Sequence, residues 1–564
     1  MRASRLLIVG ALFILSGGLL AWATQTSGGI RLVDVRFVGT GGAPMSALLY
    51  IPRNATPATP APGILAVHGY FNSREAQDGF AIEFARRGYV VLAIDQRGHG
   101  YSAPPAFAAG FGGPDGLHYL RSLDLVDHDN IGLEGHSMGG WAVVNAAAAF
   151  PQGYRAMVLE GSSTGLPFAP EGTSAFPRNL AVVFSRFDEF SATMWGVPKA
   201  RDVISSPKLQ RVFGTQAPVQ PGKLYGSLQE GSGRILYTPS ITHPMDHFST
   251  EAIGYSLDWM QRTLRGGTPK PASDQIWYWK EVGTCAALVG FVILLLGLFA
   301  ALVRLPYFAP LLASYEAPAA RPGAAAWVGL AAAALLPAIL WLPLCQLADN
   351  FLPPSRLLPQ TFTNEILVWA LCSGLISYAV SLPWRASKPR FNTHAIRSSV
   401  IALLVVGGGY VSCAIVDFLF KIDFRIWFIA VKLLSVGQAR AFLVYLVPFV
   451  FSMALILRAL YSNPLLRAGS AVSQYVVAIA ALAAGFVLFV LVEYLTLFST
   501  GQLPAVYPFD GLRVILSIQF IPLLAIVALV ATFTFRRTNS YLPGALIAAL
   551  FITWDVVAGQ ATQV

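Results

Sequence analysis

Charged residues are scarce in this chain. Only 12% of its 564 residues are Asp, Glu, Lys or Arg, whereas 55% are hydrophobic, and the mean hydropathy is +0.57. A composition this apolar excludes an ordinary soluble enzyme, so much of the chain is expected to lie in lipid. The apolar runs are unevenly spread, because residues 30–273 read as a globular mixture and long apolar runs dominate from Tyr278 onward. The sequence therefore predicts a globular part in water and a second part in lipid.

Cysteine is also rare. The four cysteines all fall in apolar runs, without the spacing of a zinc or redox motif; they are Cys285, Cys345, Cys372 and Cys413. The globular part contains no cysteine and can form no disulfide of its own. Its histidines form no zinc-type cluster in the sequence, and it has no phosphate-binding glycine loop. We therefore expect neither a metal ion nor a cofactor.

The formal net charge of +10 has a distribution that argues against a nucleic-acid partner. Basic residues gather in alternate loops between the apolar runs, as the positive-inside rule predicts for cytoplasmic loops. These segments hold one acid, Glu316, against twelve basic residues: Arg2, Arg5, Arg304, Arg321, Arg385, Lys388, Arg390, Arg397, Arg458, Arg467, Arg536 and Arg537. We expect membrane lipid as a partner and no nucleic acid.

One loop disagrees with this topology. Residues 421–440 are expected on the outer side, yet they carry four basic residues, Lys421, Arg425, Lys432 and Arg440. An interfacial helix over residues 426–434 is one explanation, because such a helix can hold cations at the headgroup level.

Four segments follow from these patterns. Residues 1–27 contain an apolar run long enough to span a membrane, Leu6 to Ala23, and also an A-x-A cleavage pattern, so they are a signal anchor or a signal peptide. Residues 28–268 form the globular domain, 269–282 a polar linker and 283–564 a membrane domain. The basic N-terminal flank predicts an integral protein of the cytoplasmic membrane with its globular domain extracytoplasmic.

The membrane domain is expected to be all-α and polytopic, with about eight transmembrane helices. The apolar runs lie at residues 283–303, 324–347, 366–384, 398–420, 441–460, 472–498, 514–535 and 542–558.

The globular domain alternates short β-branched runs with helical stretches, which predicts an α/β fold with a mostly parallel eight-stranded sheet and flanking helices. The expected strands lie at residues 31–37, 46–51, 63–67, 89–94, 130–133, 156–159, 180–184 and 234–237.

The motif Gly-His-Ser-Met-Gly-Gly, residues 135–140, lies between an expected strand and an expected helix. A serine on such a tight strand-to-helix turn needs small neighbours, which Gly135 and Gly139 supply. The N-terminus of the following helix would favour negative charge that develops when Ser137 attacks a carbonyl carbon. This pattern predicts a nucleophile elbow.

Two upstream segments complete a resemblance to the α/β-hydrolase superfamily. The sequence Val67-His68-Gly69-Tyr70 resembles the family's oxyanion loop, and Asp95 to Ser102 resembles its D-x-R-G-x-G-x-S segment, which is usually structural. The resemblance covers roughly residues 31–264 and implies an oxyanion hole made by the backbone N–H groups of Tyr70 and Met138.

The family's chain order of serine, acid and histidine implies the other catalytic residues. His243 has the family's usual spacing to the final helix and is the predicted base, with His247 as the alternative. Asp188 follows an expected strand and is the predicted acid, although Ser185 replaces the glycine that the family's acid loop usually carries. Glu189 and Glu160 are the alternatives for the acid, and a surface charge is the other reading of Glu189.

The resemblance is closest to serine aminopeptidase or lysophospholipase-like and dienelactone-hydrolase-like members. It implies a membrane-anchored serine hydrolase that cleaves an ester or amide bond of a small-molecule, lipid or peptide substrate through an acyl-enzyme. Residues 162–178 leave little room for a large lid, so we expect a comparatively open pocket. The alternative is a transporter or lipid-handling membrane protein with a regulatory or binding hydrolase-like domain.

Overall fold

The computed structural model describes residues 3–71, 73–315, 322–382, 394–504 and 510–564. The chain forms two compact units. One, called here the sheet unit, comprises Leu19–Val282, Tyr494–Gly511 and Gly559–Val564; the other, the helical unit, comprises Met1–Gly18, Gly283–Glu493 and Leu512–Ala558. Each unit is described separately below.

The sheet unit contains an eight-stranded sheet in the order β1-β2-β4-β3-β5-β6-β7-β8. The pairs β1–β2 and β2–β4 are antiparallel and the other neighbours are parallel. Every expected strand is present, within a few residues of its expected limits. The strands are β1 (Arg31–Val38), β2 (Pro44–Ile51), β3 (Ala61–Val67), β4 (Val90–Ile94), β5 (Val126–His136), β6 (Ala156–Glu160), β7 (Leu180–Val183) and β8 (Arg234–Tyr237).

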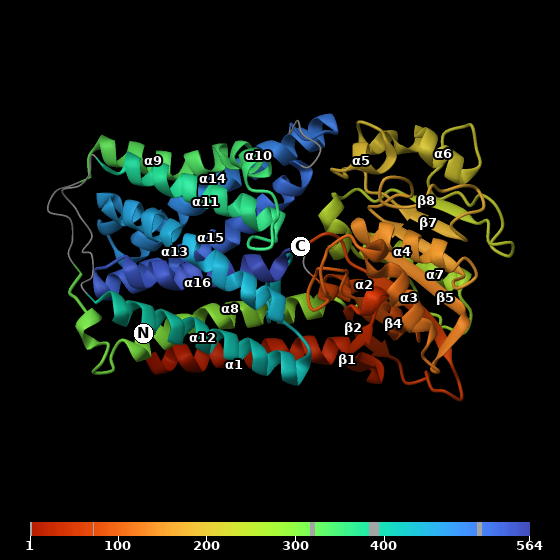
Figure 1. Ribbon diagram of the computed structural model, residues 1–564, viewed down its shortest axis with the longest axis horizontal. Coiled ribbons are helices and arrows are strands. Elements are labelled where there is room, and N and C mark those ends of the chain that lie inside the picture. Colours follow the sequence, from red (N-terminus) through yellow and green to blue (C-terminus); the bar gives the residue numbers. More distant parts are fainter. Residues whose placement is uncertain (1–2, 72, 316–321, 383–393, 505–509) are drawn as a thin grey trace. The chain divides into compact units, whose positions relative to one another are not determined.

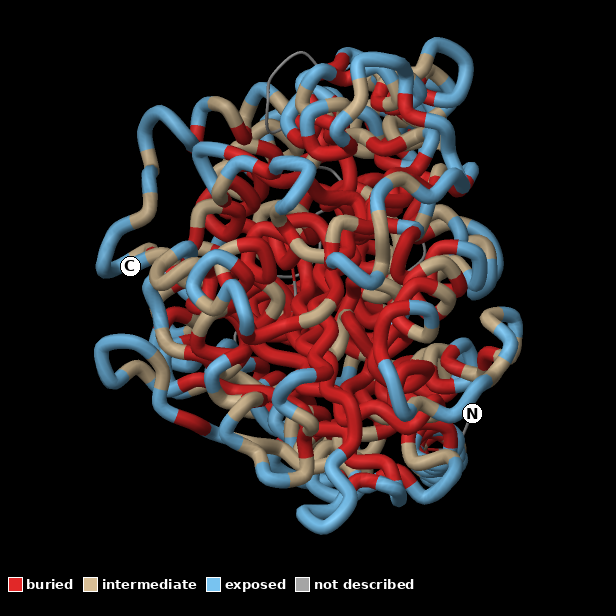
Figure 2. The backbone as a smooth tube through the Cα atoms, turned by 90° about the vertical axis from the view of Figure 1, so that its right-hand side faces the viewer, coloured by how far each residue is buried: buried red, intermediate tan, exposed pale blue. Residues whose placement is uncertain are grey.

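Helices cover both faces of the sheet (Figure 1). On one face, α2 (Asp78–Arg86) and α7 (Thr250–Thr263) share a buried apolar cluster with the strands. On the other, α3 (Gly113–Arg121) and α4 (Met138–Ala149) pack on β3 and β5. Strands covered on both faces are apolar throughout, as β3, β4 and β7 are, and Figure 2 shows this buried interior. The remaining helices are the short α5 (Ser191–Trp195) and α6 (Pro207–Phe213).

The parallel part of the sheet decides where chemistry can occur. The carboxyl ends of parallel strands meet at one edge, and the loops that follow them line a crevice there. The loops after β3, β5, β7 and β8 contain Tyr70, Ser137, Asp188 and His243, respectively. Residues far apart in the sequence are therefore brought to the same edge of the sheet.

The expected linker is an ordered part of the sheet unit. Its start is held by two arginines of α2 and its C-terminal flank: Arg87 donates to the carbonyl oxygen of Pro271 at 2.6 Å, and Arg86 pairs with Asp274 at 2.8 Å. Further along, the buried carboxylate of Glu83 accepts from the backbone N–H of Ile276 at 2.6 Å. These contacts fix residues 271–276 against the domain.

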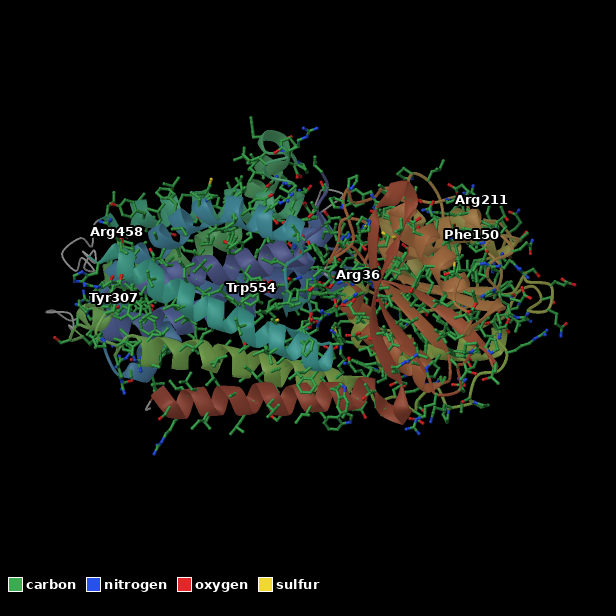
Figure 3. The ribbon with its side chains drawn as sticks, turned by 60° about the horizontal axis from the view of Figure 1, so that its bottom comes forward. Arg36, Phe150, Arg211, Tyr307, Arg458 and Trp554 are labelled. Carbon is green, nitrogen blue, oxygen red and sulfur yellow. The ribbon has the colours of Figure 1, made fainter. Side chains whose placement is uncertain are left out.

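Each of the eight apolar runs in residues 283–564 coincides with helical structure. Seven are single helices long and apolar enough to cross a membrane, and the second run is a pair bent by 48°. The helices are α8 (Tyr278–Leu302), the bent pair α9 (Ala324–Ile339) and α10 (Trp341–Phe351), α11 (Thr361–Val380), α12 (Ala395–Phe420), α13 (Val436–Ser462), α14 (Ala471–Thr500), α15 (Asp510–Thr538) and α16 (Leu542–Gly559). Within this unit Trp554 of α16 points into the helix bundle (Figure 3), where its indole N–H donates to the carbonyl oxygen of Lys432 at 2.7 Å.

The prediction of an interfacial helix over residues 426–434 is wrong. This segment forms a two-stranded hairpin of β9 (Phe424–Ile426) and β10 (Ile429–Val431), in which most backbone is buried. One of its cations is neutralised locally, because Arg425 bonds the carboxylate of Asp423 at 2.7 Å. β-branched residues such as Ile429 and Val431 favour strands, and their burial does not fit a helix lying at a surface.

Part of the charge argument falls outside the described residues. This applies to Arg2, Glu316, Arg321, Arg385, Lys388 and Arg390, which the structure does not describe.

The first helix, α1 (Ala3–Gln25), packs closely on α8 within the helical unit. A side chain at Gly17 would place its Cβ 2.4 Å from the carbonyl oxygen of Gly283, and one at Gly10 would lie 2.9 Å from that of Gly290. Small residues let the backbones of apolar helices approach this closely. Contact of this kind makes residues 3–18 of α1 an integral part of the helical unit.

This contact predicts the effect of a larger side chain. Gly17→Leu should lower the stability of the detergent-solubilised protein by about 1–3 kcal/mol, because Leu cannot fit without separating α1 from α8. Thermal unfolding followed by tryptophan fluorescence measures the change. Gly407→Leu is the matched control, since no atom lies within 4 Å of a Cβ built at Gly407 of α12; an equal loss in both variants would contradict the packing argument.

Candidate active site

Ser137 occupies a strained turn between β5 and α4. Its φ of 55° and ψ of −121° lie in a region that residues other than glycine rarely adopt. Two bonds to the end of β6 and its flank fix the turn: the Ser137 N–H donates to the Glu160 carbonyl oxygen at 2.8 Å, and the Ser162 hydroxyl donates to the Ser137 carbonyl oxygen at 2.6 Å. Strain that the surroundings hold in place is typical of a functional turn.

The glycines beside Ser137 are required by close backbone contacts. A Cβ at Gly139 would lie 2.0 Å from the carbonyl oxygen of Val67, and one at Gly135 would lie 2.3 Å from that of Gly139. No side chain fits in either place. The elbow is thus pressed against the end of β3, where the loop with Tyr70 begins.

The loop after β3 lies directly beside Ser137. A Cβ built on Gly69 would be 3.3 Å from the Ser137 Cβ. The loop is fixed from behind, because Gln96 donates its backbone N–H to Nε2 of His68 at 3.2 Å and His99 Nε2 lies 2.5 Å from the carbonyl oxygen of Tyr70. Tyr70 from this loop and Met138, the first residue of α4, therefore flank the serine.

The segment Asp95 to Ser102 braces these loops. The Asp95 carboxylate accepts from the backbone N–H groups of Arg74 at 2.9 Å and Tyr101 at 3.1 Å. The Ser102 hydroxyl donates to the Asp95 carbonyl oxygen at 2.7 Å. These bonds are structural, as the resemblance implied.

The structure brings Asp188 and His243 together. Nδ1 of His243 lies 2.8 Å from Oδ2 of Asp188, and both side chains are buried. The other oxygen of Asp188 accepts the backbone N–H of Phe190 at 2.7 Å, which fixes the carboxylate. The Phe190 ring packs edge-on against the His243 imidazole, with centroids 4.6 Å apart. The imidazole is therefore oriented from two sides.

The alternatives to these two residues have other contacts. His247 packs its ring 4.0 Å, centroid to centroid, from that of His136. Glu160 accepts the Ser256 hydroxyl deep in the fold. The hydrogen bond of 2.8 Å between a carboxylate and an imidazole is formed instead by Asp188 and His243.

For Glu189 the sequence offered two interpretations, an alternative acid or a surface charge, and the structure shows a different role. Its side chain is half-buried and both carboxyl oxygens accept hydrogen bonds, so it is not a freely exposed surface charge. Its Oε2 accepts the backbone N–H of His243 at 2.8 Å. Burial and, next, the charge of neighbouring Asp188 raise the pKa of Glu189 to about 8, although the hydrogen bond from the Tyr494 hydroxyl acts in the opposite direction. The only sequence signal was its position next to Asp188.

Asp246 is a second buried carboxylate that the sequence analysis passed over. It accepts the Ser185 hydroxyl at 2.6 Å, and its other oxygen lies 3.6 Å from Nε2 of His136. Ser185, which departs from the family's usual glycine, thus has a specific partner. Asp246 occurs in the same short segment as both candidate histidines, and this proximity in the sequence could have pointed to its place in the site.

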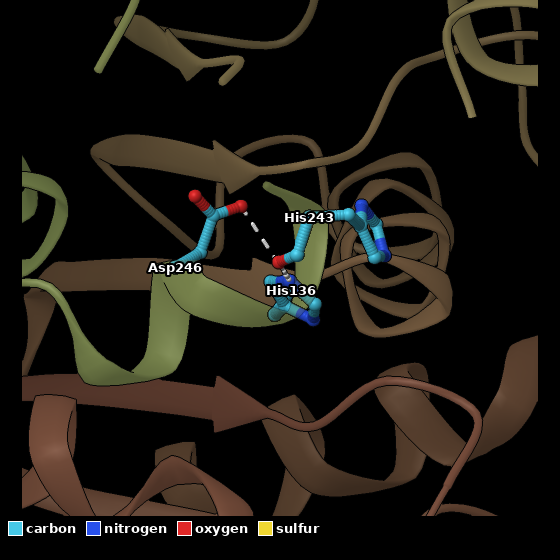
Figure 4. A group of neighbouring side chains, drawn as sticks. All are labelled: His136, His243 and Asp246. Atoms are coloured by element: carbon cyan, nitrogen blue, oxygen red, sulfur yellow. Dashed lines mark hydrogen bonds and ion pairs between the residues drawn. The ribbon is translucent and has the colours of Figure 1, made fainter. Parts of the chain in front are cut away.

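His136, His243 and Asp246 have potential metal-ligand atoms within 4.8 Å of one another. Figure 4 shows that the backbone carbonyl oxygen of His243, rather than its ring, meets the His136–Asp246 pair; His136 Nε2 lies 3.0 Å from that oxygen. The His243 Nδ1 is already bonded to Asp188. This arrangement fixes the backbone of His243 and does not fit a metal centre, which needs ligand atoms directed at one point.

The electrostatics of the site favour a neutral imidazole. Burial lowers the pKa of His243 from its ordinary value of 6.5 to about 4, although the charge of Asp246 acts in the opposite direction. A neutral imidazole held by a carboxylate at Nδ1 can accept a proton at Nε2.

An aromatic wall extends from the loop after β3. Successive rings are in contact, with centroids 4.2–6.3 Å apart, in the order Tyr70, Phe107, Phe111, Trp141 and Phe168. Phe107 and Phe111 have positive φ angles of 71° and 61°, so this loop is strained. The site itself is less accessible than the short segment 162–178 predicts, since Ser137 is only 9% and His243 4% exposed.

Comparison with known proteins agrees with this architecture. The family model described as alpha/beta hydrolase fold matches residues 62–208. A monoacylglycerol lipase of Mycolicibacterium smegmatis is 28% identical over 203 residues, which are 33% of this chain and 65% of that protein. The chain spans between 30% and 65% of the lengths of the curated relatives it matches.

Two solved structures are similar to part of the chain. An esterase of Pyrococcus furiosus is 14% identical with a TM-score of 0.32, covering 43% of this chain and 95% of that one. A dienelactone hydrolase of Anabaena variabilis is 18% identical with a TM-score of 0.28, covering 42% and 99%, respectively.

Proposed function

We propose that this protein, whose residues 62–208 match the alpha/beta hydrolase fold, is a membrane-anchored serine hydrolase that cleaves an ester or amide bond through an acyl-enzyme. The observation that carries the proposal is the 2.8 Å contact between Asp188 and His243 at the sheet edge that also holds the strained turn of Ser137. A nucleophile, a base and an orienting acid are the parts that such chemistry needs.

In the acylation step, Oγ of Ser137 forms a bond to the carbonyl carbon of the substrate while its proton passes to Nε2 of His243. Asp188 holds the imidazole in the tautomer that leaves Nε2 free to accept and stabilises its charged form. The oxyanion that develops is bound by the backbone N–H groups of Tyr70 and Met138. The C–O or C–N bond then breaks, and His243 returns the proton to the leaving alcohol or amine.

In the deacylation step, a water molecule gives its proton to His243 and attacks the acyl carbon. The bond to Ser137 breaks, the proton returns to Oγ, and the acid product leaves. No redox or metal step is required in this sequence.

The aromatic wall supports a substrate with an apolar acyl or alcohol part. Phe107 and Phe168 remain 45% and 38% exposed, which leaves ring surface on which a hydrocarbon group can pack. The similarity to a monoacylglycerol lipase, which matches this chain over 203 residues, supports a lipid ester as one candidate.

A second candidate, a transporter or lipid-handling membrane protein with a regulatory hydrolase-like domain, is favoured by one observation in the helical unit. Arg513 of α15 forms two bonds of 3.0 Å to Glu365 of α11 and a further bond to Asp349 of α10. Buried ionisable groups among apolar helices often mark a transport path or a polar cavity.

Replacement of the nucleophile separates the two candidates. Ser137→Ala should lower hydrolysis of a short p-nitrophenyl ester by at least roughly a thousandfold and abolish labelling by a fluorophosphonate, because no other residue supplies the attacking oxygen. Ser122→Ala, at an exposed position beyond α3, is the control and should label normally. Labelling of the Ser137→Ala protein at the wild-type level would reject the catalytic assignment.

The pH dependence tests His243. The base must be neutral to accept the serine proton, and burial lowers the pKa of His243 below 6.5, to about 4. The value of kcat/KM should therefore be constant from neutral pH down through 6.5 and decline only at lower pH. Activity that returns on neutralisation excludes unfolding as the cause of the decline. An acid limb centred above pH 6.5 would be incompatible with this assignment.

The side of the membrane can be tested with introduced cysteines. We propose that the sheet unit is extracytoplasmic, so Glu230→Cys should react with a membrane-impermeant maleimide in intact cells. Arg304→Cys, in a segment expected inside, should react only after permeabilisation; both positions are exposed. The wild-type chain, whose four cysteines lie in apolar helices, gives the background. The opposite labelling pattern would reverse the topology.

A further inference from the structure

Two segments from the C-terminal half of the sequence belong to the sheet unit. They are residues 494–511, where α14 ends and α15 begins, and residues 559–564, which follow α16. Each contacts a different loop of the candidate active site. A segment that served only as a membrane anchor would need no such contacts.

The first segment reaches His243 through one intermediate. The Tyr494 hydroxyl donates to Oε1 of Glu189 at 2.8 Å, and Oε2 of the same carboxyl group accepts the backbone N–H of His243 at 2.8 Å. Glu189 is half-buried, and these two bonds engage both of its carboxyl oxygens. A continuous hydrogen-bonded path therefore joins a residue of α14 to the backbone of the base.

The same segment supports the acid loop by packing. The Phe498 ring lies edge-on to Phe187, with centroids 5.0 Å apart. A Cβ at Gly511 would lie 2.9 Å from the ring of Phe190, the residue that packs against the His243 imidazole. Gln502 adds a bond of 3.1 Å to the carbonyl oxygen of Pro198. The contacts thus surround the loop that carries Asp188 and Glu189.

The second segment supports the opposite side of the site. Thr562 exchanges two backbone hydrogen bonds with the loop after β4: its N–H donates to Gly98 at 2.8 Å, and its carbonyl oxygen accepts from Ala106 at 2.9 Å. The next side chain, Gln563, donates to the Tyr70 hydroxyl at 2.9 Å. Tyr70 is the residue whose backbone N–H is assigned to the oxyanion hole.

We propose that residues 494–502 and 559–563 are positioning elements of the catalytic site, with Tyr494 fixing His243 through Glu189 and Gln563 fixing Tyr70. The proposal rests on the proposed hydrolase function and gives the C-terminal half a task beyond anchoring. Catalysis depends steeply on the placement of the base and of the oxyanion donors, since small displacements lower the rate of the chemical step more than they weaken substrate binding.

The test uses the full-length protein in detergent and a variant that removes one hydroxyl group. Tyr494→Phe should lower kcat for a short p-nitrophenyl ester about five- to tenfold with KM unchanged, because one hydrogen bond to a carboxyl group is lost and no substrate contact changes. Tyr255→Phe is the matched control: Tyr255 also donates to a glutamate, Glu251, at 2.8 Å, but on the exposed face of α7. The control should keep the wild-type kcat.

A double mutant shows whether Tyr494 acts through Glu189. Glu189→Gln alone should lower kcat, and adding Tyr494→Phe to it should lower kcat less than Tyr494→Phe does alone, because the two residues share one path. Fully multiplicative losses would overturn the proposed path.

The oxyanion side has its own variant. Gln563→Ala should lower kcat without changing KM, whereas Gln210→Ala, which removes an exposed side-chain bond to the carbonyl oxygen of Gln216, should change neither. Equal values for the Gln563→Ala and wild-type proteins would overturn the role of residues 559–563.

Hydrogen exchange tests the positioning role of Tyr494 without measuring hydrolysis. The backbone N–H of His243 is held by Glu189, so a peptide covering residues 241–248 should exchange faster in Tyr494→Phe than in the wild-type protein or in Tyr255→Phe. If the wild-type protein showed no Ser137-dependent hydrolysis, the proposed function would fail while the exchange data still decided whether Tyr494 fixes this segment. Unchanged exchange together with unchanged kcat would overturn the positioning role.

Discussion

The close approach of the turn at Ser137 to the end of β3 is the constraint on which the rest of the site depends. Gly139 lies so near the carbonyl oxygen of Val67 that no side chain fits between them. This contact keeps Ser137 in its strained backbone conformation and places the loop of Tyr70 beside it. Because the parallel strands end at one edge, the loops after β7 and β8 lie at the same edge of the sheet as the serine. The strained turn and the order of the parallel strands therefore both determine where the residues of the candidate site lie.

Around this turn the fold gathers more carboxyl groups than the proposed chemistry uses directly. Asp188 bonds the His243 imidazole, Glu189 its backbone N–H, and Asp246 lies beside His136 and accepts from Ser185. Buried carboxyl groups are costly unless they are hydrogen-bonded, and each of these accepts at least one bond. Their shared result is a histidine whose ring and backbone are both held, which suits a base that must receive a proton in one direction.

The two halves of the sequence are less separate than their compositions suggest. Composition divides the chain near residue 278, but the sheet unit also includes residues 494–511 and 559–564. The hydrogen bonds of Tyr494 and Gln563 to Glu189 and Tyr70 come from these late segments. These late segments support loops of the candidate active site. Keeping both halves in one polypeptide supplies each copy of the site with its own supporting segments, at a high effective concentration.

The sequence by itself determined the eight strands, the apolar helices and the motif at Ser137, because each is encoded by local periodicity, turn chemistry and run length. It also selected Asp188 and His243 as one pair, by chain order and by resemblance. Only the tertiary structure decided that Glu189 accepts the backbone N–H of His243, that Asp246 meets His136 and that residues 424–431 form a hairpin rather than an interfacial helix. The reason is physical: periodicity reports how a residue relates to its neighbours in the chain, whereas burial and pairing across hundreds of residues depend on which surfaces the folded chain brings together.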